Sequence, residues 1–180
     1  MLILQNFSYQ HENKDMLFQN ISFAINKYDK IALVGNNGIG KSTLLKIIAG
    51  ELPPFSGIIN QNSKPYNVPQ LFGQFNDFSV AEALHISEKI TSLKEILEGI
   101  VTEENLQILN DDWTIEDRCQ EALSYWKLQD LDLNQKMETL SGGQKTKVFL
   151  AGIMIHEPDL VLLDEPSNHL DFEGRALLYD

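Results

Sequence analysis

A glycine-rich run in the first part of the chain has the residue types and spacing of a phosphate-binding loop. It matches the pattern G-x-x-x-x-G-K-[ST] and reads Gly35, Asn36, Asn37, Gly38, Ile39, Gly40, Lys41, Ser42 and Thr43. Glycines allow the backbone to turn so that successive N–H groups converge on phosphate oxygens. A helix that begins near Lys41 would add its positive N-terminal dipole. The Lys41 ammonium can contact phosphate oxygens and the Ser42 hydroxyl can bind Mg²⁺, so the run predicts a site for a Mg-nucleotide.

Two adjacent carboxylates, Asp164 and Glu165, follow the apolar run Leu160–Leu163. Neighbouring residues of a strand point to opposite sides, so the two carboxylates cannot share one role. One can hold the water shell of Mg²⁺ while the other faces an attacking water. Taken alone, the pair could equally be solvated acids at the end of a strand. Together with the phosphate-binding loop, it favours nucleotide hydrolysis.

A third motif precedes this apolar run and reads Leu140, Ser141, Gly142, Gly143 and Gln144. If a helix begins here, its unpaired N–H groups and the Ser141 hydroxyl suit an anion. As an isolated pentapeptide, the motif could be only a loop with a helix N-cap. With the other two motifs in this order, it resembles the signature sequence of ATP-binding-cassette (ABC) ATPases, which lies ahead of their Walker B strand.

The resemblance implies an α/β fold: a P-loop NTPase cassette with an N-terminal antiparallel β-subdomain, a parallel-sheet core and a helical subdomain. It implies that residues 35–43 bind ATP, that Asp164 and Ser42 bind Mg²⁺, and that Glu165 is the catalytic glutamate that aligns water. Lys41 would stabilise the charge on the phosphates. The signature, residues 141–144, would contact the γ-phosphate of ATP held by a second ABC cassette, in a head-to-tail sandwich.

Two more site residues follow from the resemblance, each with alternatives. Gln70 resembles the Q-loop glutamine that reaches Mg²⁺ and the attacking water; Gln74 is the alternative, and Gln70 is preferred. Tyr9 resembles the aromatic residue that stacks on adenine ahead of the P-loop. Phe7 or Phe18 could serve instead, and any of the three could belong to the core.

The segment 164–171 resembles one particular family among the ABC ATPases. Its stretch Asn168-His169-Leu170-Asp171 is characteristic of the ABC-F family, although Ser167 stands where threonine is usual. Asp171 lies in the segment that resembles the D-loop, which contacts the partner cassette. An ABC-F protein carries two cassettes on one chain and acts on the ribosome, as a translation factor or in antibiotic resistance. The alternative is the ATPase subunit of a membrane transporter.

Composition and charge limit the other possibilities. The 180 residues include 14 basic and 26 acidic ones, a net charge of −12, and the range 75–139 holds 15 acidic against 5 basic residues. This range predicts a solvated acidic face that repels nucleic-acid backbones. No run of 18 apolar residues occurs, residues 1–6 do not resemble a signal peptide, and Cys119 is the single cysteine. We therefore expect a cytoplasmic protein without direct membrane insertion.

The hydrophobic pattern predicts the elements that must position these motifs. A small antiparallel sheet is expected from residues 2–4 and 21–25, with a polar turn over 10–15. Further strands are expected at 30–34, from 58 onward and at 160–163. Helices are expected over 42–49, ended by Gly50, after capping boxes at Ser79 with Glu82 and Ser92 with Glu95, over 115–127, and after Ser141.

An apolar stripe is expected along the helix 115–127; it consists of Ile115, Cys119, Ala122, Leu123 and Trp126. Trp126 and Trp113 are expected to pack in the core instead of stacking on bases. His11, His85 and His156 are assigned to surface or helix positions without a function.

We expect one incomplete cassette domain over residues 1–180. Its parts would be an ATP-binding core (1–75), a helical subdomain (76–139) and a segment with the signature helix, the Walker B strand and the D-loop (140–180). The family's switch histidine and any second cassette would lie beyond Asp180. The isolated chain is therefore expected to hydrolyse ATP weakly or not at all.

Overall fold

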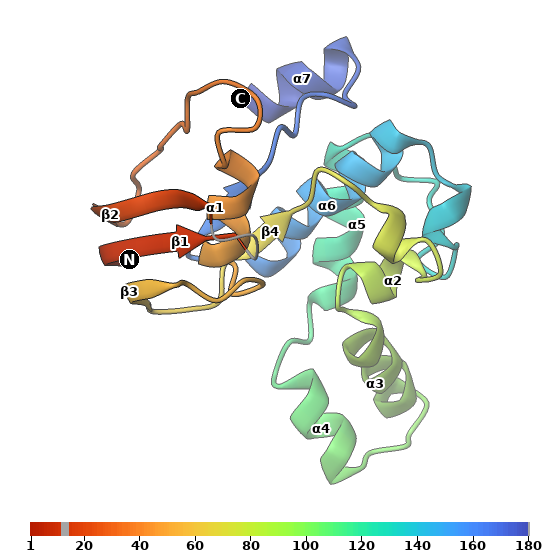
Figure 1. Ribbon diagram of the computed structural model, residues 1–180. Helices are drawn as coiled ribbons and strands as arrows, with labels where there is room; N and C mark the ends of the chain where they lie inside the picture. Colours follow the sequence, from red (N-terminus) through yellow and green to blue (C-terminus); the bar gives the residue numbers. More distant parts are fainter. Residues whose placement is uncertain (12–14, 180) are drawn as a thin grey trace. The chain divides into compact units, whose positions relative to one another are not determined.

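The computed structural model describes residues 1–11 and 15–179 (Figure 1). These residues form two compact units. The first contains Met1–Asn67 and Pro158–Asp164, and the second contains Val68–Glu157 and Glu165–Asp180. The turn expected over 10–15 lies partly outside the described residues.

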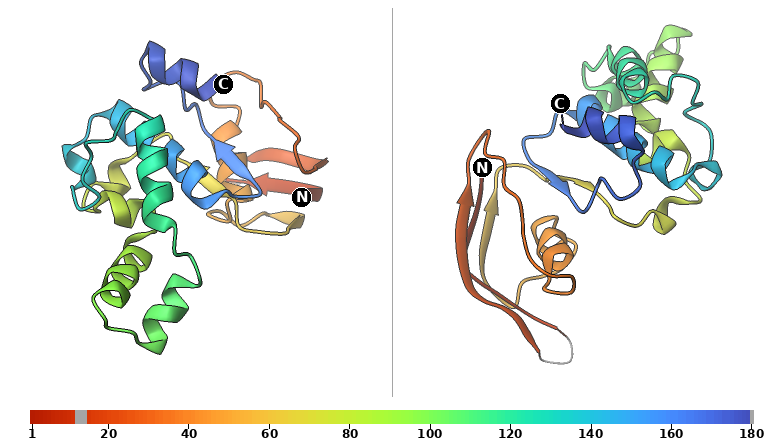
Figure 2. Two further views of the ribbon diagram at one scale, coloured as in Figure 1. Left: turned by 180° about the vertical axis from the view of Figure 1, so that it is seen from behind. Right: turned by 90° about the horizontal axis from the view of Figure 1, so that it is seen from above.

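The first unit contains a three-stranded antiparallel sheet in the order β2-β1-β3. The strands are β1 (Leu2–Gln10), β2 (Met16–Ile25) and β3 (Ser56–Gln61), and they include the predicted runs 2–4, 21–25 and 58–59. Helix α1 (Lys41–Ile48) covers one face of this sheet, as the right-hand view of Figure 2 shows. The core between them consists of Leu2, Leu4, Phe7, Leu44, Ile47, Ile48 and Leu162.

A second sheet pairs β4 (Tyr66–Val68) with β5 (Val161–Leu163) in parallel. Strand β5 confirms the prediction for residues 160–163. The strand predicted at 30–34 is wrong, because these residues form no strand. A strand of a parallel sheet needs a hydrogen-bonded neighbouring strand and other elements that cover both of its faces. Among the described residues, this sheet contains only β4 and β5. Ile31 is 54% exposed and Val34 is 94% exposed.

The second unit is helical. Its helices are α2 (Val80–Ala83), α3 (Ser87–Leu97), α4 (Glu103–Leu109), α5 (Ile115–Tyr125), α6 (Gly142–His156) and α7 (Phe172–Tyr179), with 3-10 turns at Gly73–Phe75 and Met137–Thr139. Helix α3 packs on α4, and α5 packs on α6 (Figure 1). Helices α2 to α5 lie within 76–139, the range expected to be helical. The expected division of the cassette into three parts stays a prediction.

The predicted apolar stripe of α5 is confirmed, since Ile115, Cys119, Ala122, Leu123 and Trp126 are all buried. The prediction that Trp113 packs in the core is wrong. Its side chain is 49% exposed in the turn before α5, where it belongs to no buried helix face.

One of the two predicted capping boxes forms. Ser79 Oγ accepts from the N–H of Glu82, and the Glu82 carboxylate accepts from the N–H of Ser79. The backbone N–H of Ser79 thereby lowers the pKa of Glu82. The box predicted at Ser92 and Glu95 is wrong, because α3 begins at Ser87 and Ser92 is buried inside it.

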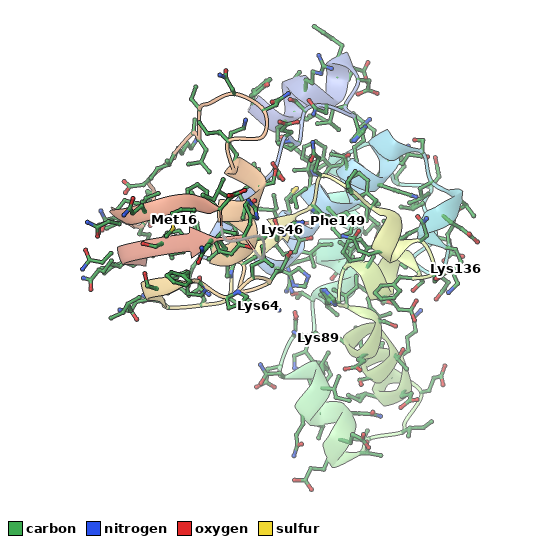
Figure 3. The ribbon with its side chains drawn as sticks, in the orientation of Figure 1. Met16, Lys46, Lys64, Lys89, Lys136 and Phe149 are labelled. Atoms are coloured by element: carbon green, nitrogen blue, oxygen red, sulfur yellow. The ribbon has the colours of Figure 1, made fainter. Side chains whose placement is uncertain are left out.

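Hydrogen bonds of Asp112 and Arg118 connect α5 to α3 and to α6 in the second unit. Arg118 donates to both oxygens of Asp112, at 2.7 and 2.9 Å. Lys89 on α3, which is labelled in Figure 3, donates to the same carboxylate at 2.8 Å. The Arg118 Nε–H also donates to the carbonyl of Ile155, near the end of α6, at 3.2 Å. Hydrogen bonds from Arg118 lower the pKa of Asp112 despite partial burial.

The imidazole Nε2 of His156 forms a 2.7 Å hydrogen bond with the carbonyl of Leu84. This bond ties the end of α6 to the residue after α2. Among the described residues, no helix is both long enough and apolar enough to span a membrane.

Candidate functional site

The glycine-rich loop leads directly into α1, as the sequence predicts. The backbone of Gly40 has φ +105°, and a Cβ at this position would lie 2.7 Å from the Phe18 ring and 2.8 Å from Leu17. Only glycine fits there. The structure places Gly40 at the N-cap of α1, and no side chain among the described residues caps this end. The first-turn N–H groups therefore face outward from a helix end that suits an anion.

Lys41 folds back onto the loop that it follows. Its ammonium donates to the carbonyl oxygens of Gly35 at 2.8 Å and Asn36 at 3.1 Å. A phosphate would compete with these carbonyls for the ammonium, because charged hydrogen bonds to phosphate are the stronger ones. Ser42 and Asp164 belong to the same compact unit as the loop, and both side chains are partly buried.

The oxygen ligands of this unit fit Mg²⁺. The Ser42 hydroxyl and the Asp164 carboxylate are hard donors of the kind that Mg²⁺ takes alongside water and substrate phosphates. The described residues contain no group of three or more His, Cys, Asp or Glu side chains that could hold a metal.

The structure separates the aromatic candidates for adenine stacking. Phe7 is completely buried and is a core residue, with its ring 6.0 Å from that of Phe18. Tyr9 lies opposite Phe18 in the β1–β2 register and is partly buried, with its ring edge-on to His11 at 5.5 Å. The role of Tyr9 toward adenine stays a prediction.

Glu165 lies in the second unit, where two amides hold one of its carboxylate oxygens. Gln70 Nε2 donates to Glu165 Oε2 at 3.0 Å, and Asn168 Nδ2 donates to the same oxygen at 2.7 Å. Gln74, the alternative to Gln70, is exposed in the 3-10 turn at Gly73–Phe75. The role of Gln70 toward Mg²⁺ and the attacking water stays a prediction. Asn168 is not among the site residues predicted from the sequence. The feature that could have indicated it is an amide side chain three residues after the carboxylate of Glu165.

The signature motif begins α6. Ser141 is the N-cap: its Oγ accepts from the N–H of Gln144 at 3.3 Å, and Gln144 Oε1 accepts from the N–H of Ser141 at 3.0 Å. This capping box leaves the first-turn N–H groups of Gly142 and Gly143 for another acceptor. The motif is therefore a helix N-cap, and its exposed end still suits an anion.

His169 lies against this end of α6. A Cβ on Gly143 would lie 2.8 Å from the His169 carbonyl oxygen, and one on Gly142 would lie 3.6 Å from His169 Nδ1. The same histidine ring meets Phe72 edge-on at 6.0 Å, and Phe72 stacks at 5.6 Å on Phe149 of α6, which is labelled in Figure 3. The loop after Gln70, the segment 165–171 and the signature helix are thus packed together within one unit.

Asp171, in the expected D-loop, caps α7. Its Oδ1 accepts from the N–H of Gly174 at 2.7 Å, and Lys147 donates to its Oδ2 at 3.3 Å. The backbone hydrogen bond from Gly174 is the main cause of a lowered pKa for this carboxyl group. Asp171 therefore fixes the end of the segment that begins at Glu165.

The chain is similar to many known proteins. A family model described as "ABC transporter" matches residues 18–168. Protein GCN20 of Saccharomyces cerevisiae is 33% identical over 178 residues, covering 98% of this chain and 21% of that protein. ABC transporter F family member 3 of Arabidopsis thaliana is 34% identical over 168 residues, covering 93% and 21%. The energy-coupling factor transporter ATP-binding protein EcfA1 of Enterococcus faecalis is 33% identical over 172 residues, covering 94% and 60%.

Solved structures show the same fold. An ATP-binding subunit of an ABC transporter matches with a TM-score of 0.74 and 22% identity, over 99% of this chain and 71% of that one. The ATP-binding cassette MJ0796, solved as a dimer in a post-hydrolysis state with ADP and Pi, matches with a TM-score of 0.73 and 22% identity, over 99% and 79%. The chain spans about a fifth of the length of GCN20. With the loop before α1, the signature at α6 and the carboxylates after β5, these matches show that the chain belongs to the ABC transporter family and has the α/β fold of its ATP-binding cassettes.

Proposed function

We propose that this cassette binds Mg-ATP and hydrolyses it when paired with a second cassette. The proposal rests on the hydrogen bonds of Glu165, whose Oε2 accepts from the amides of Gln70 and Asn168. Within the described residues, Oε1 has no hydrogen-bond partner and can accept from a water. In a chain that also carries the phosphate-binding loop and the signature, this is the arrangement expected of a carboxylate that aligns the attacking water.

The roles of the other residues follow from their chemistry. The first-turn N–H groups of α1 would bind phosphate oxygens, and the Lys41 ammonium would leave the carbonyls of Gly35 and Asn36 for the β- and γ-phosphates. Ser42 and Asp164 would hold Mg²⁺, which neutralises charge on those oxygens when bound. The phosphoryl-transfer transition state needs little covalent chemistry, so positioning and charge neutralisation carry the reaction.

The signature would act on ATP bound by the second cassette. Ser141 and Gly142 are exposed at the start of α6, and the N–H groups of Gly142 and Gly143 are the donors for a γ-phosphate. ATP would close the pair of cassettes and hydrolysis would open it. This proposal predicts an ATPase rate per molecule that depends on the pairing of cassettes, which can be measured by varying the protein concentration of the purified chain. A high rate at all concentrations would contradict it.

We further propose that the protein is an ABC-F protein that acts on the ribosome from the cytoplasm. The stretch Asn168-His169-Leu170-Asp171 supports this, as does similarity to ABC transporter F family member 3. The second candidate is the ATPase subunit of a membrane transporter. It is supported by similarity to EcfA1, an ATP-binding protein of a transporter, at nearly the same identity.

One experiment separates the two candidates. The native gene product with Glu165→Gln is incubated with ATP and cell extract, and its sedimentation with ribosomes and with membrane vesicles is measured. ATP-dependent sedimentation with ribosomes supports the ABC-F proposal. Sedimentation with membranes alone contradicts it and favours the transporter subunit.

A further inference from the structure

Asn168 makes the shorter of the two side-chain hydrogen bonds to Glu165. The Asn168 amide lies 2.7 Å from Oε2, compared with 3.0 Å for the amide of Gln70. Both donors reach the same oxygen. The carboxylate is therefore held in one rotational state, with Oε1 directed away from the two amides.

The backbone turn from Glu165 to Asn168 brings these two side chains together. Glu165 has φ +50°, a left-handed conformation that is uncommon for a residue with a side chain. It starts a tight turn in which the N–H of Asn168 donates to the carbonyl of Glu165 at 3.2 Å. Arg175 of α7 fixes this turn, since its Nε–H donates to the carbonyls of Ser167 at 3.2 Å and Leu170 at 3.1 Å. The turn thus returns the Asn168 side chain to the carboxylate.

The two amides differ in where they are anchored. Gln70 belongs to a loop 95 positions away in the sequence, so any movement of that loop would break its bond to Glu165. Asn168 belongs to the same short turn as Glu165, so its bond does not depend on the loop.

We propose that Asn168 is a positioning residue that keeps Glu165 aligned independently of the loop that carries Gln70. This inference rests on the proposed ATPase function. Asn168 touches neither ATP nor water in this account; it fixes Oε2 so that Oε1 stays directed at the attacking water. Its amide is the required group, because a carboxylate at position 168 would repel Glu165 and an apolar side chain would leave Oε2 unheld.

The test uses two variants of similar size in the native gene product, Asn168→Leu and Asn168→Asp. Loss of one hydrogen bond to a charged group corresponds to about a tenfold effect. We expect kcat for ATP hydrolysis to fall by about tenfold in Asn168→Leu and by more in Asn168→Asp, with KM for ATP changed less than about twofold. Gln129→Ala, which removes an exposed amide of the same unit, is the matched control and should behave as wild type.

The ATPase rates of the wild-type protein and of Glu165→Gln separate failure of this inference from failure of the proposed function. If Glu165→Gln lowers kcat by at least about a hundredfold but both Asn168 variants keep kcat within twofold of wild type, the positioning role is refuted and the ATPase proposal stands. If the wild-type protein does not hydrolyse ATP, the proposed function is refuted. If Glu165→Gln hydrolyses ATP at the wild-type rate, the role of Glu165 is refuted and the positioning role of Asn168 with it. In the Glu165→Gln background, Asn168→Leu should cause no further loss of rate; an additive loss would show that Asn168 acts elsewhere.

Discussion

Replacing Gly143 by alanine should destabilise the unit that contains α6. The new Cβ would lie 2.8 Å from the carbonyl oxygen of His169, a contact between backbone-fixed atoms that no rotamer change relieves. At Gly142 the nearest atom would be His169 Nδ1 at 3.6 Å, an ordinary van der Waals distance. Both glycines lie in the first turn of α6, so the gain in helix propensity, about 1 kcal/mol at most, is similar for both.

Gly142→Ala is therefore the matched control for Gly143→Ala. Forcing extra volume into a packed position costs about 1–3 kcal/mol, and we expect the free energy of unfolding of Gly143→Ala to be lower than that of Gly142→Ala by about this amount. Urea unfolding followed by tryptophan fluorescence measures the difference, because both tryptophans, Trp113 and Trp126, belong to the same unit. Equal unfolding free energies for the two variants would refute the close packing of His169 on the signature.

Three further predictions concern other parts of the chain. Gly40→Ala should weaken ATP binding by more than about tenfold in a titration, because the new Cβ would meet Phe18 at 2.7 Å and distort the start of α1. Arg118→Met should lower the free energy of unfolding by about 1–3 kcal/mol in urea, since it leaves the mostly buried Asp112 carboxylate with only Lys89. Because the pKa of Asp112 is lowered in the folded chain, its contribution is complete above its ordinary unfolded pKa and is lost as the pH falls through the lowered value. Asp112→Asn should therefore show a smaller loss of stability than wild type between neutral and acidic pH.

Local patterns in the sequence predicted the motif-bearing elements well. The glycine-rich loop precedes α1, Ser141 caps α6, and Ser79 with Glu82 forms a capping box. In each case the structure depends on residues only three or four positions apart. Such short-range geometry is readable from residue types alone.

The errors arose where the outcome depends on distant residues. The run 30–34 has the composition of a buried strand, but a strand forms only beside a hydrogen-bonded neighbour. Ser92 and Glu95 have the spacing of a capping box, but α3 begins at Ser87, more than one turn earlier, and buries Ile90 in the core. Asn168 could not be selected, because its contact with Glu165 depends on a left-handed backbone at that glutamate.

The proposal that Glu165 aligns the attacking water is tested by ATP hydrolysis in the Glu165→Gln variant. The native gene product and this variant are compared for ATP turnover and for ATP retained after rapid gel filtration. We expect turnover to fall by at least about a hundredfold while ATP stays bound, because only the water-aligning carboxylate is changed. Turnover at the wild-type rate, or loss of ATP binding together with turnover, would contradict the role assigned to Glu165.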